Sequence, residues 1–113
     1  MAIPSGSGTE VLKRAFKDGN NNGWHDILTG SANHIYTILS LVFTDQQDAS
    51  GNISVAIKTG STYIYILSGH SHSAQATFTW NDKIVLHETD ILQVYNTVTL
   101  GDWWLSYIDQ DWT

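Results

Sequence analysis

Short runs of alternating apolar and polar residues recur along most of this chain. Residues 52–58 alternate, with Ile53, Val55 and Ile57 on one side, which is the pattern of a strand with one buried face. Residues 34–44 are instead rich in β-branched and aromatic side chains, and both sides of this run are apolar over its middle. A strand of that composition is expected at the centre of a sheet, covered on both faces.

Two short polar links favour hairpins. The link Thr59-Gly60-Ser61 predicts a hairpin between the alternating strand and residues 62–68. In the same way, Asn81-Asp82 predicts a second hairpin between residues 75–80 and residues 83–86. Strands joined by such tight turns run antiparallel, so the sequence predicts antiparallel sheets.

The remaining strands complete an all-β fold. No window shows a sustained helical period with capping residues at its ends. About eight short strands at this spacing are typical of a sandwich, so we expect a single antiparallel β-sandwich of the jelly-roll type. Residues 1–10 are rich in Ser and Gly, which predicts a flexible or extended N-terminal arm before a sandwich domain at residues 11–113. The other predicted strands are residues 11–16, 24–28, 91–95 and 103–108.

The composition indicates that something other than water covers part of the surface. Hydrophobic residues make up 42% of the 113 positions and charged residues only 14%, and five Trp and five Tyr are present. Charged side chains normally cover a solvated surface, whereas Tyr and Trp are favoured in interfaces. Because there is no cysteine, no disulfide can hold so small a fold together, and we expect a homo-oligomer in which subunits stabilise one another.

The charges are unevenly distributed along the chain. Three of the five basic residues are Lys13, Arg14 and Lys17, whereas residues 18–113 carry ten acidic side chains against two lysines, a net charge of −8. The negative charge of residues 18–113 repels the phosphate backbone of nucleic acids, so we expect no direct binding of nucleic acid. The basic segment is expected to bind an acidic neighbour, with solvated charges on an exposed strand as the alternative.

Neither the start of the chain nor any apolar run indicates a membrane. The first residues lack the basic region and the apolar run of a secretory signal, and no apolar stretch approaches the ~20 residues of a membrane span. We therefore expect a soluble product made in the cytosol, with no membrane partner.

The sequence contains no arrangement that predicts catalysis, a cofactor or a metal site. His70 and His72 could share one ion, but two ligands do not make a site, and a polar loop with solvent-facing imidazoles is the preferred interpretation. Asp109 and Asp111 are likewise expected to be solvated acids. Because there is also no Gly-x-Ser-x-Gly elbow, cysteine nucleophile or phosphate-binding glycine loop, we expect no enzyme activity.

The tryptophans indicate where partners bind. Trp103 and Trp104 are adjacent, so on a strand one must face the core and the other must face outward, where it needs a neighbour. Trp112 has no obvious core to fill unless the tail docks on another surface. The predicted partner-binding residues are Lys13, Arg14, Lys17, Trp103, Trp104 and Trp112.

A carbohydrate-binding module is the alternative from another class. Such a module stacks exposed aromatic rings on sugars, and Trp103, Trp104 or Tyr65 could serve in that way. Interface packing is favoured because charge is scarce over the whole chain and not only beside one polar-rimmed groove.

Four stretches of the sequence carry a resemblance: MAIPSGSGTEV at residues 1–11, ANHIYTIL at 32–39, FTWNDKIVL at 78–86 and SYIDQ at 106–110. They resemble short virion structural proteins of marine tailed bacteriophages, particularly those that infect cyanobacteria. The resemblance covers most of the chain and implies a β-sandwich with an N-terminal arm and no catalytic motif. It also implies a place in the virion, assembled in the host cytoplasm.

Within this class, the basic segment and the outward tryptophans favour a capsid decoration, or cement, protein. Such a protein would bind the phage head through residues 1–17 and stabilise it by self-association. The expected partners are further copies of this chain, in a trimer or another cyclic order, and the major capsid protein or other virion proteins. A tail, neck or fibre component is the alternative.

Overall fold

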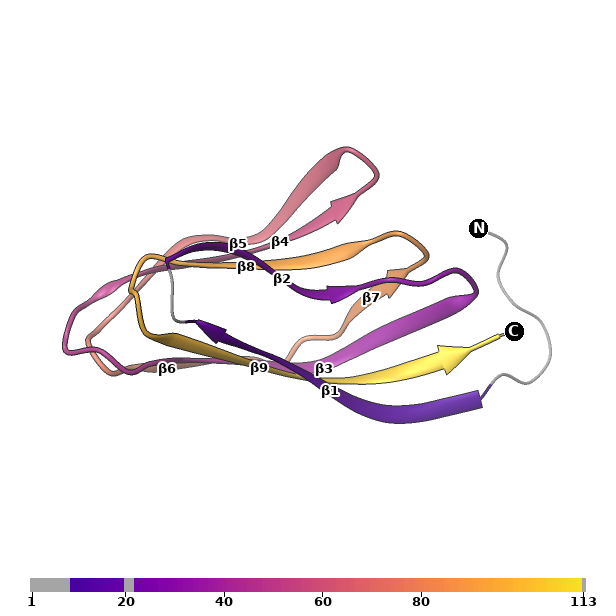
Figure 1. The fold of residues 1–113 in the computed structure, drawn as a ribbon, viewed down its shortest axis with the longest axis horizontal. Coiled ribbons are helices and arrows are strands. Elements are labelled where there is room, and N and C mark those ends of the chain that lie inside the picture. Colours follow the sequence, from indigo (N-terminus) through magenta and orange to yellow (C-terminus); the bar gives the residue numbers. More distant parts are fainter. Residues whose placement is uncertain (1–8, 20–21, 113) are drawn as a thin grey trace.

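The computed structural model describes residues 9–19 and 22–112, whose strands form two antiparallel sheets packed face to face (Figure 1). Sheet A has the order β1-β9-β3-β6, with β7 also paired to β3, and sheet B has the order β2-β8-β4-β5. The predicted β-sandwich is confirmed, with nine strands described where about eight were expected. The strands are β1 (Thr9–Gly19), β2 (Gly23–Thr29), β3 (His34–Asp45), β4 (Gly51–Thr59), β5 (Thr62–His72), β6 (Thr77–Trp80), β7 (Ile84–His87), β8 (Ile91–Asn96) and β9 (Gly101–Asp111).

One of the two predicted hairpins is confirmed and the other is wrong. Strands β4 and β5 pair up to Thr59 opposite Thr62, and Gly60 takes the left-handed φ of +62° that so tight a turn requires. Strands β6 and β7 do not pair with each other, because both pair with β3, Trp80 opposite Leu41 and Ile84 opposite Ile38. The twelve-residue β3 is long enough to take both four-residue strands end to end along one edge.

Strand β3 is central in sheet A, but only one of its faces meets the core, so the expectation of cover on both faces is wrong. A β-bulge between Ile38 and Ser40 shifts the register against β9. Because one extra residue reverses the alternation, the inward side chains are Tyr36 and Ile38 before the bulge and Leu41 and Phe43 after it. Both sides of the run therefore look apolar in the sequence although each half of the strand has a single buried face.

Strand β4 is more buried than the sequence predicted, whereas β3 is less buried. Its predicted inward residues Ile53 and Val55 are buried, but Ser54 and Ala56 on the other face are buried as well. Aromatic side chains from β2 and β5 lie across that face and cover these two small residues. A strand predicted to be half-buried is thus covered on both sides over its middle.

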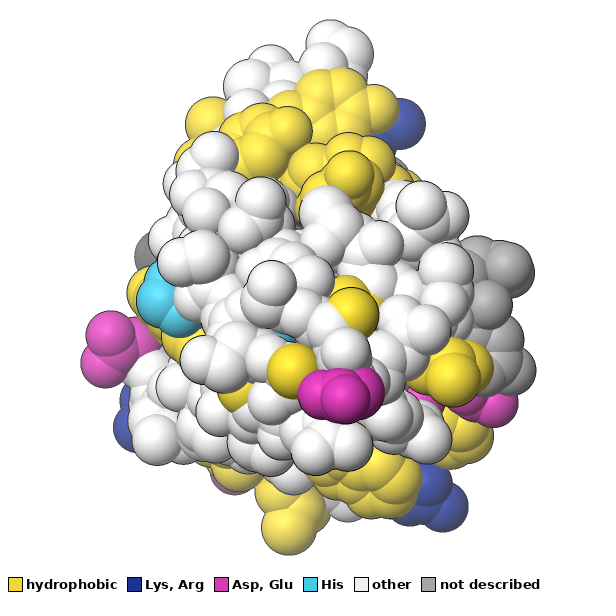
Figure 2. All heavy atoms as spheres, turned by 90° about the vertical axis from the view of Figure 1, so that its left-hand side faces the viewer, with side chains coloured by type: hydrophobic (Ala, Val, Ile, Leu, Met, Phe, Trp, Pro, Cys, Tyr) yellow, Lys and Arg dark blue, Asp and Glu magenta, His cyan; other side chains and the backbone are white. Residues whose placement is uncertain are grey.

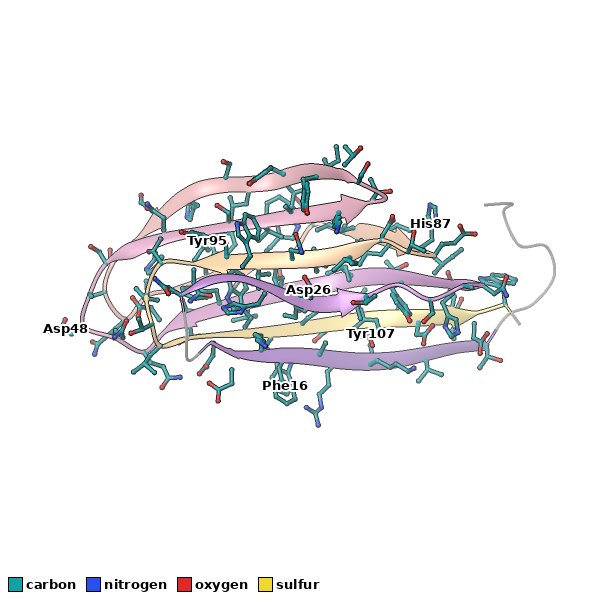
Figure 3. All side chains as sticks on the ribbon, turned by 45° about the horizontal axis from the view of Figure 1, so that its top comes forward. Phe16, Asp26, Asp48, His87, Tyr95 and Tyr107 are labelled. Carbon is teal, nitrogen blue, oxygen red and sulfur yellow. The ribbon has the colours of Figure 1, made fainter. Side chains whose placement is uncertain are left out.

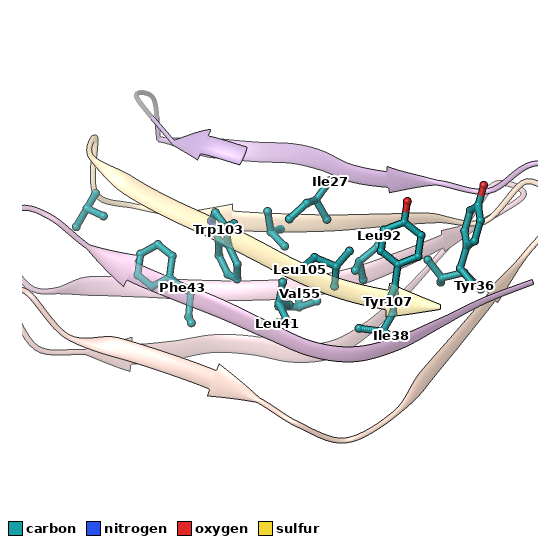
Figure 4. Packing of buried hydrophobic residues seen from close by; sticks show 14 residues of the cluster. Ile27, Tyr36, Ile38, Leu41, Phe43, Val55, Leu92, Trp103, Leu105 and Tyr107 are labelled. Carbon is teal, nitrogen blue, oxygen red and sulfur yellow. The ribbon is translucent and has the colours of Figure 1, made fainter. Parts of the chain in front are cut away.

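The core lies between the sheets and is built from large aliphatic and aromatic side chains (Figure 4). Trp103 packs on Phe43 with ring centroids 4.7 Å apart, and its indole N–H donates to Asn96 Oδ1 at 3.1 Å. Asn96 in turn donates to the Val98 carbonyl at 2.7 Å, so this buried amide is hydrogen-bonded on both sides.

Strand β1 forms an edge of sheet A and pairs with β9 from Thr9 opposite Asp111 to Gly19 opposite Gly101. The basic segment therefore belongs to the sheet from Thr9 onward, and residues 1–8 of the expected arm lie outside the described residues. In the described part of the chain, no helix is long and apolar enough to cross a membrane.

Candidate docking surface on sheet A

The outer face of β1 and β9 carries an exposed group of apolar and basic side chains. We call Leu12, Arg14, Phe16 and Trp104 the sheet A patch. Phe16 pairs with Trp104 across the two strands, and both project away from the core, with 59% and 44% of their surface exposed. Figure 3 shows Phe16 pointing out from β1, away from the sandwich. An apolar group of this size in contact with water favours a partner.

The sheet A patch is organised by its rings. Phe16 and Trp104 stack with centroids 5.8 Å apart and an interplanar angle of 14°. The Arg14 guanidinium lies 5.0 Å from the Trp104 ring centroid and 5.7 Å from that of Phe16, which is cation–π distance. The charge is thereby held beside the two rings, where it can meet an acidic group on a partner.

A hollow of about 500 Å³ adjoins the sheet A patch on the same sheet. Phe16 and Trp104 form part of its wall, together with Val42 and Thr44 of β3. Gln46 hydrogen-bonds Asp102 on another part of the wall. Apolar walls with a polar rim are the usual composition of a site that receives a partner side chain.

Lys13 is engaged within the chain and does not belong to the sheet A patch. It faces the inner side of β1, where its ammonium lies 2.8 Å from Asp109, and His34 reaches the other oxygen of Asp109 at 2.7 Å. Asp109 is only 4% exposed, so the expectation that it is a solvated acid is wrong. Pairing between residues 96 positions apart is decided by the register of β1 against β9.

These contacts change two pKa values. Burial alone would raise the pKa of Asp109, but hydrogen bonds and positive charge from Lys13 and His34 outweigh it and hold that pKa below its ordinary value of 3.8. The hydrogen bond to Asp109, followed by its negative charge, raises the pKa of Lys13 above 10.5. The ion pair thus stabilises the folded state at neutral pH.

Asp109→Asn is expected to flatten the acid limb of the stability curve. A carboxyl whose pKa is lowered on folding contributes stability above its unfolded pKa and loses it as pH falls through the folded pKa. The loss attributable to Asp109 therefore sets in below about pH 4. Urea unfolding at several pH values between about 5 and 2.5 measures it. Asp82→Asn, at an exposed turn, is the control, and identical acid limbs in the wild type and Asp109→Asn would contradict the assignment.

The other predicted partner-binding residues take different positions. Trp103 is buried in the core, so of the adjacent pair only Trp104 is available to a partner. Lys17 is exposed on β1 and lines the hollow beside the sheet A patch. Trp112 follows β9, its backbone N–H donates to the Asn33 carbonyl at 2.9 Å, and its ring is half-buried.

The histidine pair lies at the end of β5 and not in a loop. His70 is exposed and packs its ring on Phe78 at 5.0 Å. The His72 side chain is buried against Phe43 and lies 3.5 Å from Asp45, so the expectation of a solvent-facing ring is wrong for His72. Among the described residues, no three His, Cys, Asp or Glu side chains gather closely enough to hold a metal ion.

Sequence reasoning missed most of a second aromatic group, on the outer face of sheet B. We call Trp24, Tyr63, Tyr65 and Tyr95 the sheet B cluster. Trp24 contacts Tyr65 at 5.7 Å and Tyr95 at 5.2 Å between ring centroids. Tyr63 and Tyr65 are two apart on β5, and this spacing was the only signal in the sequence that they share a face.

Comparisons with known proteins give similarity of fold only. No protein-family model and no curated protein matches this chain. A chain in the acidic stable capsid structure of Helicobacter pylori bacteriophage KHP30 superposes with a TM-score of 0.57 at 10% identity, over 98% of this chain and 92% of that chain.

Two further solved structures are less similar. A chain of infectious bursal disease virus, Gx strain, gives a TM-score of 0.48 at 11% identity, over 97% of this chain and 32% of its own. The CBM22-1 xylan-binding domain of Paenibacillus barcinonensis Xyn10C gives a TM-score of 0.46 at 12% identity, over 95% of this chain and 87% of its own. The chain thus has a β-sandwich fold that also occurs in a bacteriophage capsid structure.

Proposed function

We propose that this protein is a structural component of a bacteriophage particle, and that it decorates the capsid. The observation that carries the proposal is the match to a chain of the KHP30 capsid structure over nearly the full length of both chains. The likeness therefore extends over the sandwich as a whole and not over one part of it.

The sheet A patch supports the same proposal. A decoration protein must hold to a shell and to its own neighbours, and both tasks need exposed side chains that bind when desolvated. Trp104 and Arg14 are of the residue types that contribute most to such interfaces, and Phe16 is of a type that is enriched in them. Among the described strands, none pairs with the outer edge of β1, and this edge could accept a strand from a neighbouring subunit or from the shell.

Immunogold labelling of intact particles tests the proposed position. Label distributed over the head is the expected result. Label confined to the tail, the neck or a fibre would eliminate decoration and leave the alternative virion role. Sedimentation velocity completes the test, because a stable monomer at micromolar concentration would contradict the proposed self-association.

The double variant Phe16→Ala/Trp104→Ala is expected to bind phage particles that lack this protein at least about tenfold more weakly than the wild type. This corresponds to a loss of about 1.4 kcal/mol of binding free energy. Both rings lie in the patch proposed to be desolvated on binding. The measurement is the occupancy of particles titrated with purified protein. Tyr63→Ala/Ile64→Ala, which removes exposed side chains of β5 in the other sheet, is the matched control. Equal losses for both double variants would place the interface outside the sheet A patch.

A further inference from the structure

The outer face of sheet B carries a second concentration of exposed apolar surface, separate from the sheet A patch. Figure 2 shows hydrophobic side chains gathered at the top of the molecule, on the β4–β5 side, as well as at the bottom, on the β1 side. Trp24, Tyr63 and Tyr65 are 42%, 53% and 53% exposed. Three large aromatic side chains that lie beside one another and are exposed to water indicate a ligand that contacts their rings.

These rings surround a hollow that also has polar groups. It has a volume of about 350 Å³ and is lined by Trp24, Tyr63, Tyr65 and Gln93. Gln93 Nε2 donates to Asp26 Oδ1 at 2.7 Å, so an amide and a carboxylate stand together beside the aromatic walls. Aromatic walls with a few polar groups that both donate and accept are the usual composition of a small-molecule site.

A second hollow of about 330 Å³ lies against the same pair of rings. Trp24 and Tyr65 belong to both hollows, and their rings meet edge to face at 81°. Ser54, Ser68 and Tyr95 line the second hollow and supply hydroxyl groups. The two hollows therefore adjoin one another across the Trp24–Tyr65 ridge and could hold successive units of one chain-like ligand.

The geometry points to a binding site for a neutral oligosaccharide, with one sugar unit in each hollow. A pyranose offers an apolar C–H face to an aromatic ring and hydroxyls to amides, carboxylates and serines, which matches both linings. An anionic ligand is disfavoured by Asp26 and by the net charge of −8 over residues 18–113. A cation is disfavoured because the Lys58 ammonium already lies 5.6 Å from the Tyr63 ring.

The small residues of β4 explain why the aromatic rings of the sheet B cluster can lie close against the sheet. Ser54 and Ala56 are opposite Tyr95 and Gln93 on β8, and Ala56 is also opposite Tyr65 on β5. Larger side chains at these two positions would lift the rings of Trp24 and Tyr65 off the sheet. A cross-strand aromatic ladder that only stabilises the sheet is the competing explanation, and it predicts no ligand.

Isothermal titration calorimetry with cellohexaose, xylohexaose, maltohexaose and mannohexaose tests the site on the full chain. Saccharide concentrations should reach about 10 mM, so that binding with a dissociation constant of about 1 mM is still measured. At least one hexasaccharide is expected to bind, and more tightly than its own monosaccharide, because two hollows are filled. Failure of all four to bind the wild type would overturn the proposal and favour the structural ladder.

Variants locate the binding. Trp24→Ala and Tyr65→Ala are each expected to weaken the bound hexasaccharide at least about tenfold, and Trp24→Phe to restore part of the affinity because a ring remains. Val85→Ala, an exposed apolar residue on the other sheet, is the matched control and should bind as the wild type does. Circular dichroism of each variant verifies folding. Unchanged affinity in folded Trp24→Ala and Tyr65→Ala would overturn the assignment of the site.

This site does not depend on the proposed virion role. It lies on the sheet opposite the sheet A patch, so loss of saccharide binding and loss of particle binding are separate outcomes. If Trp24→Ala reduced particle occupancy while no saccharide bound, the sheet B cluster would be a protein interface and the oligosaccharide proposal would fall.

Discussion

Trp103→Ala is expected to lower the free energy of unfolding by about 4 kcal/mol, the range for large aromatic-to-alanine changes in a packed core. The side chain is 1% exposed and packs on Phe43. Its removal leaves a cavity between the sheets and also deprives Asn96 Oδ1 of the hydrogen bond that the indole donates. For a domain that is marginally stable, a loss of this size populates the unfolded state at moderate temperature.

Trp104→Ala is the matched control, because the neighbouring residue has the same side chain and the opposite face. Trp104 is 44% exposed, so its replacement should cost less than about 1.5 kcal/mol, the range of one surface aromatic contact. Urea unfolding followed by far-ultraviolet circular dichroism, at one fixed protein concentration, gives both values. Similar losses for the two variants would show that β9 presents its faces differently.

Gly30→Ala has the second-largest expected effect, about 2 to 3 kcal/mol, within the range for overpacking a well-packed site. Gly30 follows β2 and lies against the β7–β8 turn, where its N–H donates to the Asp90 carbonyl at 2.7 Å. A methyl group at Gly30 would overlap the Glu88 carbonyl oxygen and lie 2.9 Å from its carbon. Both atoms are backbone, so the turn itself must move.

Thermal unfolding measures this loss, at about 4 °C of melting temperature for each kcal/mol in a domain of this size. Gly60→Ala is the control that separates a steric clash from an unfavourable backbone conformation. Gly60 has a positive φ, but a Cβ added there would meet open space. Its cost should be about 1 kcal/mol. A Gly30→Ala protein as stable as Gly60→Ala would show that the turn yields without strain.

The sequence identified several residues of the candidate docking surface, but it did not show how they are arranged in space. The basic segment was recognised from its charge, yet Arg14 and Lys13 face opposite sides of β1 and have different partners. Alternation along one strand separates these two residues onto opposite faces, but the partner that each one meets belongs to β9, about a hundred residues away. Lys13 is consequently neutralised by Asp109, whereas Arg14 stays beside the exposed rings of Phe16 and Trp104.

The sheet B cluster illustrates the same limit. Trp24, Tyr65 and Tyr95 come from β2, β5 and β8, and none of their separations in the sequence indicates contact. They meet because β2, β8, β4 and β5 lie in one sheet in that order, and the small side chains of Ser54 and Ala56 on β4 let the rings of Trp24 and Tyr65 reach each other across it. Contacts of this kind follow from long-range strand pairing, which local patterns do not encode.

Local patterns in the sequence were sufficient to predict the fold class, the absence of helical periodicity, the β4–β5 hairpin and the rule that one of Trp103 and Trp104 must face outward. These depend on side-chain period and turn chemistry, which are local properties. The folded structure was needed to establish that Trp104 is the outward one, that β6 and β7 share an edge of β3, and that a bulge at Leu39 reverses which residues of β3 face the core. Each of these depends on register between distant strands, because shifting a strand by one residue moves every side chain to the other face.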